Sequence, residues 1–372
     1  SQRRAGEVFG EIAIIDQGPR TATVTALERC ELLMIDAAQL HRRLEDSDPI
    51  LRMCLHVLID RFRDMIRSKL VESSRIGTEL VAGLSKEQHR TSYEQVVGAL
   101  KLEHELAQAI HQEDFELHYQ PMIELQEGRI AGLEALVRWR HRERGLIPPM
   151  LFIPAAESSG LIAPLGRWCL KEACRAQRRF TAALPDGHPS KERLFVSVNV
   201  TSRDLADGDF VPHLDSIIEE TGIDPTQLKL EITETLLMQD PDVACETLNR
   251  CRVKGLSIAI DDFGTGYSSL SYLHRFPIDT LKIDRSFIAA MSEDAANREI
   301  IRTIVGLGRQ LNKPVVAEGI EELHQAVSIR DMGATYGQGY YFSKPQDEAT
   351  ITQLLLRWDA AMMSGSDLRV AG

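Results

Sequence analysis

Polar residues of a few types accompany a series of short apolar runs in this sequence. In chain order they are Glu134, Asn199, Glu231, Asp261 with Asp262, Lys282, Glu318 and Gln338. Five of them are carboxylates, and carboxylates packed together without compensation repel one another until several stay protonated. Hard divalent cations relieve this repulsion, because Mg²⁺ and Mn²⁺ prefer oxygen ligands. The residue types therefore predict a magnesium or manganese site.

The composition of this set also bears on which metal it suits and how many ions. No histidine accompanies the acids, which disfavours zinc and non-haem iron. Asp261 and Asp262 are adjacent and are expected to point differently at a strand end, so that each favours a different ion. This suits a two-metal centre, in which cations roughly 3.5–4 Å apart activate a water molecule and stabilise a phosphoryl transition state. Taken singly, each acid is better explained as a helix cap, a turn residue or a solvated side chain. The series at successive strand ends is what favours ligation.

The elements that must position these residues are eight apolar runs, separated mainly by helical stretches. Such near-continuous runs are typical of strands buried on both faces of a parallel sheet. We predict an α/β fold, a TIM-like (β/α)8 barrel, in which the C-terminal ends of the strands converge on one face. A doubly wound open sheet is the alternative. The predicted strands are Phe115–Tyr119, Ile130–Val137, Leu194–Val200, Leu228–Ile232, Leu256–Ile260, Thr280–Ile283, Val315–Ala317 and Tyr340–Phe342.

The region before the barrel has two other patterns. Residues 1–36 alternate as strands do, for example over Thr23–Ala26, and residues 40–110 are mostly helical in their spacing. We therefore expect a partial β-roll and linker helices in front of the barrel. Because the chain opens with Ser inside what looks like a folded motif, we also expect a fragment of a longer polypeptide.

Composition disfavours several classes of function. There are 43 Lys and Arg against 55 Asp and Glu, and the resulting charge of −12 argues against direct nucleic-acid binding. A transcription regulator is a further alternative, disfavoured by this charge and by the lack of a helix-turn-helix pattern. No apolar run approaches about 18 residues, so no membrane contact is expected. The six cysteines form no Cys-x-x-Cys pair and predict reduced thiols in the cytoplasm.

A set of motifs occurs in a fixed order along the second part of the chain. A lone Glu-Ala-Leu is a weak signal, but the ordered set is highly specific. The motifs are Tyr119-Gln120-Pro121, Glu134-Ala135-Leu136 extended to Arg138, Asn199, Glu231 to Glu234, Asp261 to Leu270, Lys282 to Asp284, Ala317 to Glu321 and Gln338-Gly339. With these motifs, residues 102–356 resemble the EAL family of cyclic di-GMP phosphodiesterases.

This resemblance implies a role for each matching residue. The implied catalytic residues are Glu134, Asp261, Asp262, Lys282 and Glu318, with Lys282 holding the attacking water. The implied ligands of two Mg²⁺ or Mn²⁺ ions are Glu134, Asn199, Glu231, Asp261, Asp262 and Glu318. The implied substrate-binding residues are Gln120, Arg138, Asn199 and Gln338, with Arg138 gripping a phosphate. Asp284 and Glu321 are weaker candidates for supporting the site.

The loop Phe263–Ser269 directly follows two of these ligands. The resemblance implies that Glu234 anchors this loop. It also implies that Gly264 and Gly266 let the loop wrap close to the metals and couple the site to a dimer interface. A tight turn is the alternative explanation for the two glycines.

The activity that the resemblance implies is hydrolysis of one phosphodiester bond of cyclic di-GMP. Water would attack in line, the 3′ oxygen would leave, and the product would be linear pGpG. No ligand of the family's set is missing, so we expect an active enzyme and a homodimer formed through the EAL domain. A non-catalytic cyclic di-GMP receptor acting through a protein partner is the alternative.

The front end of the chain carries a second resemblance. Gly10-Glu11 and the later Arg20-Thr21 are similar to the phosphate-binding cassette of cyclic-nucleotide-binding domains. This resemblance implies that Arg20 binds a cyclic phosphate and that Glu11 binds a ribose hydroxyl, with cAMP or cGMP as the effector. The alternative is a strand–turn–strand with a surface ion pair. The expected division is a partial cyclic-nucleotide-binding domain (1–68), a helical linker (69–101), the EAL barrel (102–356) and a C-terminal tail (357–372).

Overall fold

The computed structural model describes residues 23–30, 101–110, 112, 114–238, 240–265, 275–292 and 294–358. The chain divides into two compact units, Ser1–His104 and Glu105–Gly372. In the first unit, residues 23–30 are exposed and form neither helix nor strand, so the strand predicted over Thr23–Ala26 is wrong. Alternation alone does not make a strand, because an extended segment needs a neighbouring strand to complete its hydrogen bonds. The candidate cyclic-nucleotide residues Gly10, Glu11, Arg20 and Thr21 lie outside the described residues.

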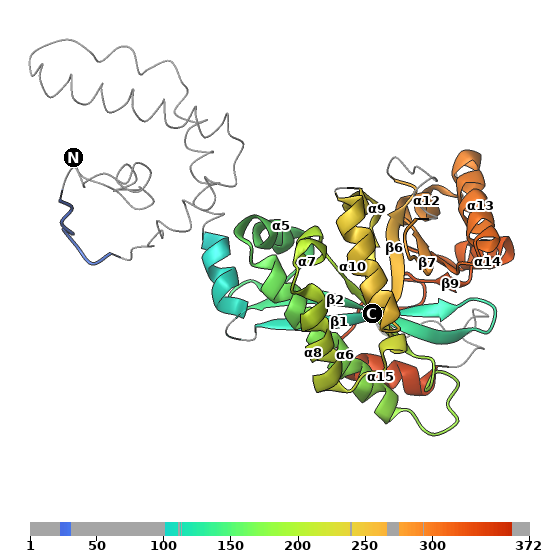
Figure 1. The fold of residues 1–372 in the computed structure, drawn as a ribbon, viewed down its shortest axis with the longest axis horizontal. Coiled ribbons are helices and arrows are strands. Elements are labelled where there is room, and N and C mark those ends of the chain that lie inside the picture. The colour runs from blue at the N-terminus through green and yellow to red at the C-terminus, as the bar shows by residue number, and fades with distance from the viewer. Residues whose placement is uncertain are drawn as a thin grey trace, which may run out of the picture. The chain divides into compact units, whose positions relative to one another are not determined.

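The second unit is a closed barrel surrounded by helices (Figure 1). Strand β1 pairs with both β9 and β2, and this closes the sheet, while β3 extends from the outer end of β2. The predicted α/β barrel is confirmed, and the open sheet is excluded. The strands are β1 (Phe115–Glu124), β2 (Arg129–His141), β3 (Gly145–Ile147), β4 (Phe195–Asn199), β5 (Leu228–Thr233), β6 (Ser257–Phe263), β7 (Thr280–Ile283), β8 (Val315–Ala317) and β9 (Tyr336–Gly337).

Two features of the barrel differ from a uniform repeat of parallel strands. Strand β1 runs antiparallel to both of its neighbours, β2 and β9. The turn Leu125–Gly128 is too short for a crossover helix, so β1 and β2 form a hairpin. The last strand is also displaced from its predicted place. Tyr340–Phe342 lies outside any strand, and Tyr340 is exposed, so the prediction of a strand there is wrong. Gln338 therefore directly follows the last strand, as Glu318 follows β8.

Helix α13 illustrates how the outer layer forms. Asp294 caps its first turn by accepting a hydrogen bond from the backbone of Ala296. Its buried residues Ile301, Ile304 and Val305 recur at helical spacing, and the helix packs against β7 and β8. Among the described residues, the α-helices that follow β3 are α5 (Pro149–Ser159), α6 (Ile162–Ala183), α7 (Ser202–Ala206), α8 (Phe210–Thr221), α9 (Glu234–Leu237), α10 (Pro241–Val253), α12 (Arg285–Ala290), α13 (Ala295–Gln310), α14 (Leu323–Met332) and α15 (Glu348–Arg357).

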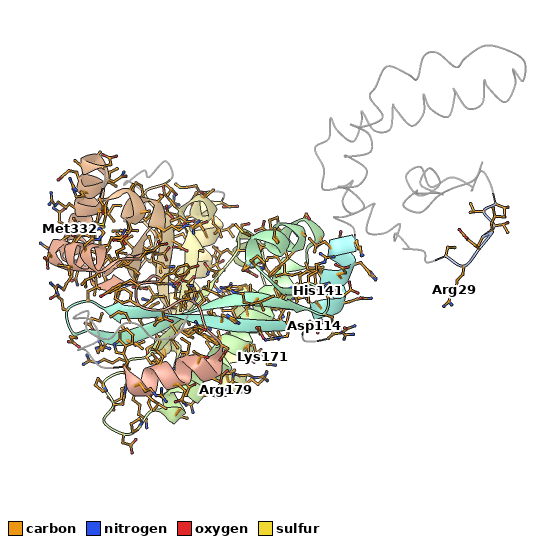
Figure 2. The ribbon with its side chains drawn as sticks, turned by 180° about the vertical axis from the view of Figure 1, so that it is seen from behind. Arg29, Asp114, His141, Lys171, Arg179 and Met332 are labelled. Carbon is orange, nitrogen blue, oxygen red and sulfur yellow. The ribbon has the colours of Figure 1, made fainter. Side chains whose placement is uncertain are left out.

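The last helix is held against the barrel by charge. Arg179 of α6 donates two hydrogen bonds to the Glu348 carboxylate at the start of α15, at 2.5 and 2.7 Å. Arg179 and Lys171 both lie on the outer side of the barrel (Figure 2). Trp358, just past the end of α15, donates to the carbonyl of Gly128 at 2.7 Å. Within the described part of the chain, no helix is both long and apolar enough to cross a membrane.

The interior of the barrel is unusually polar. Barrels of this kind are normally filled by bulky branched apolar side chains. Here many inward-facing positions hold buried polar residues, which are therefore costly unless they are paired. They include Gln120, Glu134, Ser197, Lys229, Glu231, Thr280, Lys282 and Gln338.

Candidate active site

Lys282 stands at the centre of the polar interior. Its side chain is 1% exposed, and its ammonium Nζ lies 2.5 Å from both Glu231 Oε2 and Glu318 Oε1. Asp261 Oδ1 is 3.2 Å away and Glu134 Oε2 is 3.8 Å away. These acids come from β5, β6, β2 and the residue after β8. The barrel thus brings together five residues that the sequence spreads over some 180 positions.

Amide side chains join the acids to β1. Asn199 Nδ2 donates to Glu134 Oε1 at 3.0 Å, and Gln338 Nε2 donates to Glu134 Oε2 at 2.5 Å. Gln338 Nε2 also donates to Gln120 Oε1 at 3.0 Å. Gln120 and Glu134 are directly paired across the β1–β2 ladder. All four residues singled out in the sequence therefore form one hydrogen-bonded chain.

The end of β6 departs from regular strand geometry. Its register against β7 shifts between Ile260 and Phe263, and Asp262 has a positive φ of 54°. Regular alternation would send neighbouring side chains to opposite faces. Instead, carboxylate oxygens of Asp261, Asp262 and Glu318 all lie within 4.8 Å of one another. The left-handed backbone at Asp262, uncommon outside glycine, brings adjacent acids into one cluster.

The pKa values of Glu231, Asp262 and Glu318 are shifted toward protonation. Burial raises the pKa of Glu231 to about 7 and holds that of Glu318 well above its usual value. Burial, together with the charges of Asp261 and Asp284, raises the pKa of Asp262 to about 6. Burial alone would lower the pKa of Lys282, but the surrounding carboxylates outweigh it and hold the pKa well above its usual value. One ammonium therefore does not neutralise the cluster.

The donor set fits hard divalent cations. Glu231 Oε1 is fully buried and has no hydrogen-bond partner among the described residues, and a buried carboxylate oxygen is costly in that state. The surrounding donors are carboxylate and amide oxygens, with no histidine in the cluster described here. Mg²⁺ and Mn²⁺ match oxygen ligands of this kind. The residues that would hold them are Glu134, Asn199, Glu231, Asp261, Asp262 and Glu318.

Arg138 lies beside the cluster, on the same face of β2 as Glu134. Its Nη1 donates to the carbonyl of Val137 at 2.9 Å, and it pairs with no described carboxylate. Burial lowers the pKa of Arg138, while Tyr340 and Glu134 raise it. Other N–H groups of the guanidinium are thus left to bind an anionic ligand.

The loop after β6 is held at its start. Glu234, the first residue of α9, accepts a hydrogen bond from the backbone N–H of Gly264 at 3.3 Å. Gly264 has a φ of 99°, and a Cβ there would lie 3.2 Å from the Phe287 ring. The positive φ and the close Phe287 ring both favour glycine at this position. Gly266 lies outside the described residues.

Two weaker candidates have separate places. Asp284 caps α12 by accepting from the Ser286 backbone at 3.0 Å, and its charge contributes to the raised pKa of Asp262. Glu321 is exposed, and its backbone N–H donates to Gln325 at 2.8 Å. No described contact joins the Glu321 side chain to the acid cluster.

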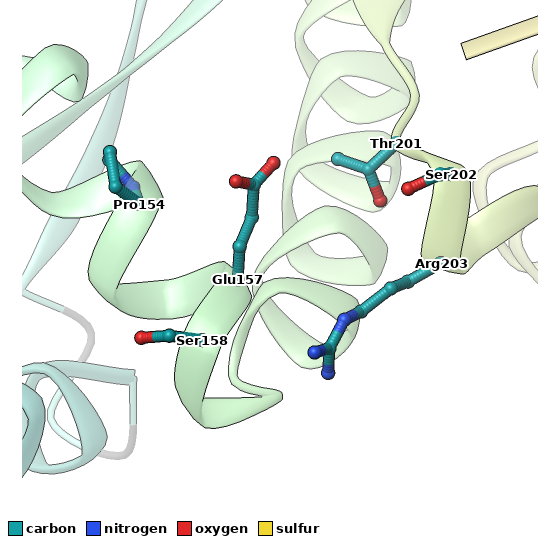
Figure 3. Close-up of a pocket in the computed structure, with 6 residues that line it drawn as sticks. All are labelled: Pro154, Glu157, Ser158, Thr201, Ser202 and Arg203. Atoms are coloured by element: carbon teal, nitrogen blue, oxygen red, sulfur yellow. The ribbon is translucent and has the colours of Figure 1, made fainter. Parts of the chain in front are cut away.

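A cavity that the sequence does not reveal lies next to Asn199 along the chain (Figure 3). Its volume is about 410 Å³. The Glu157 carboxylate of α5 points between Pro154 and Thr201 in this view. The lining residues are Pro154, Glu157, Ser158, Thr201, Ser202 and Arg203. They are ordinary surface residue types, so no sequence signal distinguishes them from a solvated helix face.

Comparison with known protein families agrees with this geometry. The model of the EAL domain matches residues 103–345. The chain belongs to the EAL domain family. The model of the cyclic nucleotide-binding domain matches residues 2–47, ahead of the EAL domain. Both resemblances seen in the sequence are therefore confirmed, and the EAL match covers most of the chain.

Curated relatives share the EAL domain. The cyclic di-GMP phosphodiesterase NbdA of Pseudomonas aeruginosa is 42% identical over 264 residues, which are 70% of this chain and 33% of that protein. The cyclic di-GMP phosphodiesterase PdeR of Escherichia coli is 37% identical over 246 residues, which are 66% of this chain and 36% of that protein. The chain spans about a third of the length of the curated relatives it matches.

Solved structures resemble this EAL protein as well. The EAL enzyme Bd1971 in its form bound to cAMP and cyclic di-GMP is 34% identical, with a TM-score of 0.71, covering 94% of this chain and 87% of that chain. The PaMucR phosphodiesterase in complex with cyclic di-GMP is 38% identical, with a TM-score of 0.64, covering 68% of this chain and 99% of that chain.

Proposed function

We propose that the EAL barrel hydrolyses one phosphodiester bond of cyclic di-GMP to linear pGpG, using two Mg²⁺ or Mn²⁺ ions. The observation that carries this proposal is the group of four carboxylates, from Glu134, Glu231, Asp261 and Glu318, gathered around the Lys282 ammonium. The relatives NbdA and PdeR, both named as cyclic di-GMP phosphodiesterases, support the same substrate.

Each residue of the acid cluster has a proposed role that depends on its position. Glu134, Asn199, Glu231 and Asp261 would hold one cation, Asp262 would serve the other, and Glu318 would complete the site. Bound cations of this kind lower the pKa of water and neutralise charge on the transferring phosphoryl group. Lys282 holds the attacking water in line with the scissile bond. The new bond forms between phosphorus and the water oxygen, and the bond from phosphorus to the 3′ oxygen breaks.

The substrate is held by groups around the acid cluster. The guanidinium of Arg138 donates to a phosphate, and the amides of Gln120 and Gln338 contact the dinucleotide. One guanine base enters the cavity beside Asn199, where the Glu157 carboxylate accepts hydrogen bonds from the base edge. The size of the cavity and the exposed Glu157 carboxylate in its lining support this placement, since guanine presents adjacent N–H donors that match a carboxylate.

The front end supplies regulation in this proposal. The cyclic-nucleotide-binding domain, expected over residues 1–68, takes cAMP or cGMP through Arg20 and Glu11. A helical linker over 69–101 passes the signal to the barrel at 102–356, which pairs with a second copy through the loop that Glu234 anchors. The resemblance to Bd1971, whose structures hold cAMP, cGMP and cyclic di-GMP, supports this arrangement.

One pair of assays separates an enzyme from a receptor. Cyclic di-GMP is incubated with the chain in Mg²⁺, in Mn²⁺ and in EDTA, and products are resolved by chromatography while binding is measured by calorimetry. An enzyme yields linear pGpG in metal and binds without turnover in EDTA. Binding with no product in any metal would make this chain a receptor. Adding cAMP or cGMP to the same assay, with an N-terminally extended chain alongside, tests the effector.

A further inference from the structure

A second lysine is buried in the barrel below the acid cluster. Lys229 is 7% exposed, and in the described part of the chain Lys282 is the other buried lysine. Lys229 precedes Glu231 by two residues on β5, so strand alternation places both side chains on the inner face. The chemistry proposed above gives Lys229 no task, although a buried charge is costly and needs compensation.

The groups in contact with the Lys229 ammonium are neutral. Nζ donates to the Thr280 hydroxyl at 3.1 Å and lies 4.1 Å from the centre of the Phe195 ring and 5.8 Å from that of Tyr336. No described carboxylate forms an ion pair with it. The ammonium is thus fixed by a hydroxyl and two aromatic faces, which attract a cation without cancelling its charge.

The neighbouring strands leave room for the Lys229 ammonium and the groups that contact it. A Cβ at Gly132 would lie 2.3 Å from the Phe195 ring, so the ring packs directly on the backbone of β2. The contacts of Lys229 with Thr280 and of Glu231 with Lys282 both pass from β5 to β7 across β6. Between them β6 presents Ala259, whose small side chain does not block the crossing. The barrel therefore contains two stacked levels, an ammonium below and a carboxylate cluster above.

Charge acts between these levels. The interior has a low effective dielectric, so a fixed cation there attracts the acids and repels any cation that they bind. Lys229 and Glu231 are two residues apart on the inner face of β5, so their side chains are direct neighbours on that face.

We propose that Lys229 is a positioning residue that sets the metal affinity of the acid cluster. Its charge holds the carboxylates together before metal binds and weakens the hold on cations once they are bound. This inference rests on the metal-dependent function proposed above.

The test is calorimetric titration of the full chain with Mn²⁺ at pH 7, with thermal unfolding measured in EDTA and in Mn²⁺. Lys229→Met removes the charge and keeps the length, and Lys229→Arg keeps the charge. We expect Lys229→Met to bind Mn²⁺ about three- to tenfold more tightly, as expected for removal of a nearby repelling charge. We expect it to unfold at a lower temperature in EDTA and to gain more from Mn²⁺ than the wild type. Lys229→Arg should bind with the wild-type affinity.

A packing role would lower both unfolding temperatures equally and leave the Mn²⁺ affinity unchanged, and that result overturns the inference, as does weaker binding. Where Lys229→Met does not fold, Lys229→Gln is measured in its place against the same expectations. A wild-type chain that binds no Mn²⁺ overturns the proposed metal-dependent function and this inference together. A wild type that binds Mn²⁺ beside an unchanged Lys229→Met overturns the inference alone.

Discussion

Replacement of Lys282 by Met removes the ammonium that faces four carboxylates while keeping the length of the side chain. Breaking a buried charge pair by removing one partner costs about 3–5 kcal/mol, because the remaining charge is left uncompensated. In a domain of this size each kcal/mol lowers the unfolding temperature by about 2–4 °C. We therefore expect Lys282→Met to unfold about 6–20 °C below the wild type in EDTA.

Bound cations change this expectation, because they compensate the same carboxylates. In Mn²⁺ the deficit of Lys282→Met should fall to less than half of its value in EDTA. Both values come from thermal unfolding followed by circular dichroism. Lys254→Met is the matched control, since Lys254 pairs with Asp215 at 2.6 Å near the surface, where an ion pair contributes about 0–1 kcal/mol. Equal deficits in EDTA and Mn²⁺ would refute the reasoning and leave Lys282 with a packing role.

Three further predictions concern other parts of the site. In EDTA, the free energy of unfolding should fall as the pH rises from 5 to 8. Glu231 and Asp262 have folded-state pKa values of about 7 and about 6, above their unfolded values, so the folded state holds protons in this range that the unfolded state has lost. Unfolding temperatures that rise over the same range would contradict this. Gly264→Ala should cost about 1–3 kcal/mol in urea unfolding, because of its positive φ and the Phe287 contact. Gly306→Ala, with open space around it, should cost nothing. Glu157→Gln should raise KM for cyclic di-GMP about tenfold with kcat little changed, as a lost charged hydrogen bond to the substrate predicts, and an unchanged KM in steady-state kinetics would remove Glu157 from the binding site.

The acid cluster could be predicted from the sequence because the barrel topology alone brings the strands that carry it together. Once the apolar runs are taken as strands of one barrel, their C-terminal ends must meet. Glu134, Glu231, Asp261 and Lys282 then fall together without any knowledge of side-chain conformation. The network from Gln120 through Gln338 to Glu134 does not follow from strand position, because the predicted last strand begins after Gln338, whereas the observed one ends just before it.

Other features depend on geometry that residue types do not encode. The run Tyr340–Phe342 is as apolar as a strand, yet Tyr340 is exposed and the last strand is Tyr336–Gly337. Strand β1 is antiparallel to β2 because the turn Leu125–Gly128 between them is short, and the pattern of apolar residues does not predict this. The positive φ of Asp262 is a local backbone conformation that the residue type does not predict, because most aspartates have a negative φ. Lys229 reads as an exposed lysine in a half-buried strand, because its compensation comes from Phe195 and Thr280 on distant segments.

The most direct test of the account is turnover of cyclic di-GMP by the wild type and by Glu134→Ala, side by side in Mg²⁺. Glu134 joins Asn199, Gln338 and Lys282 in one contact network, so its loss opens the site at its centre. The account predicts that the wild type forms pGpG in Mg²⁺, that EDTA stops it, and that folded Glu134→Ala forms none. Turnover retained by Glu134→Ala in added Mg²⁺ would contradict it.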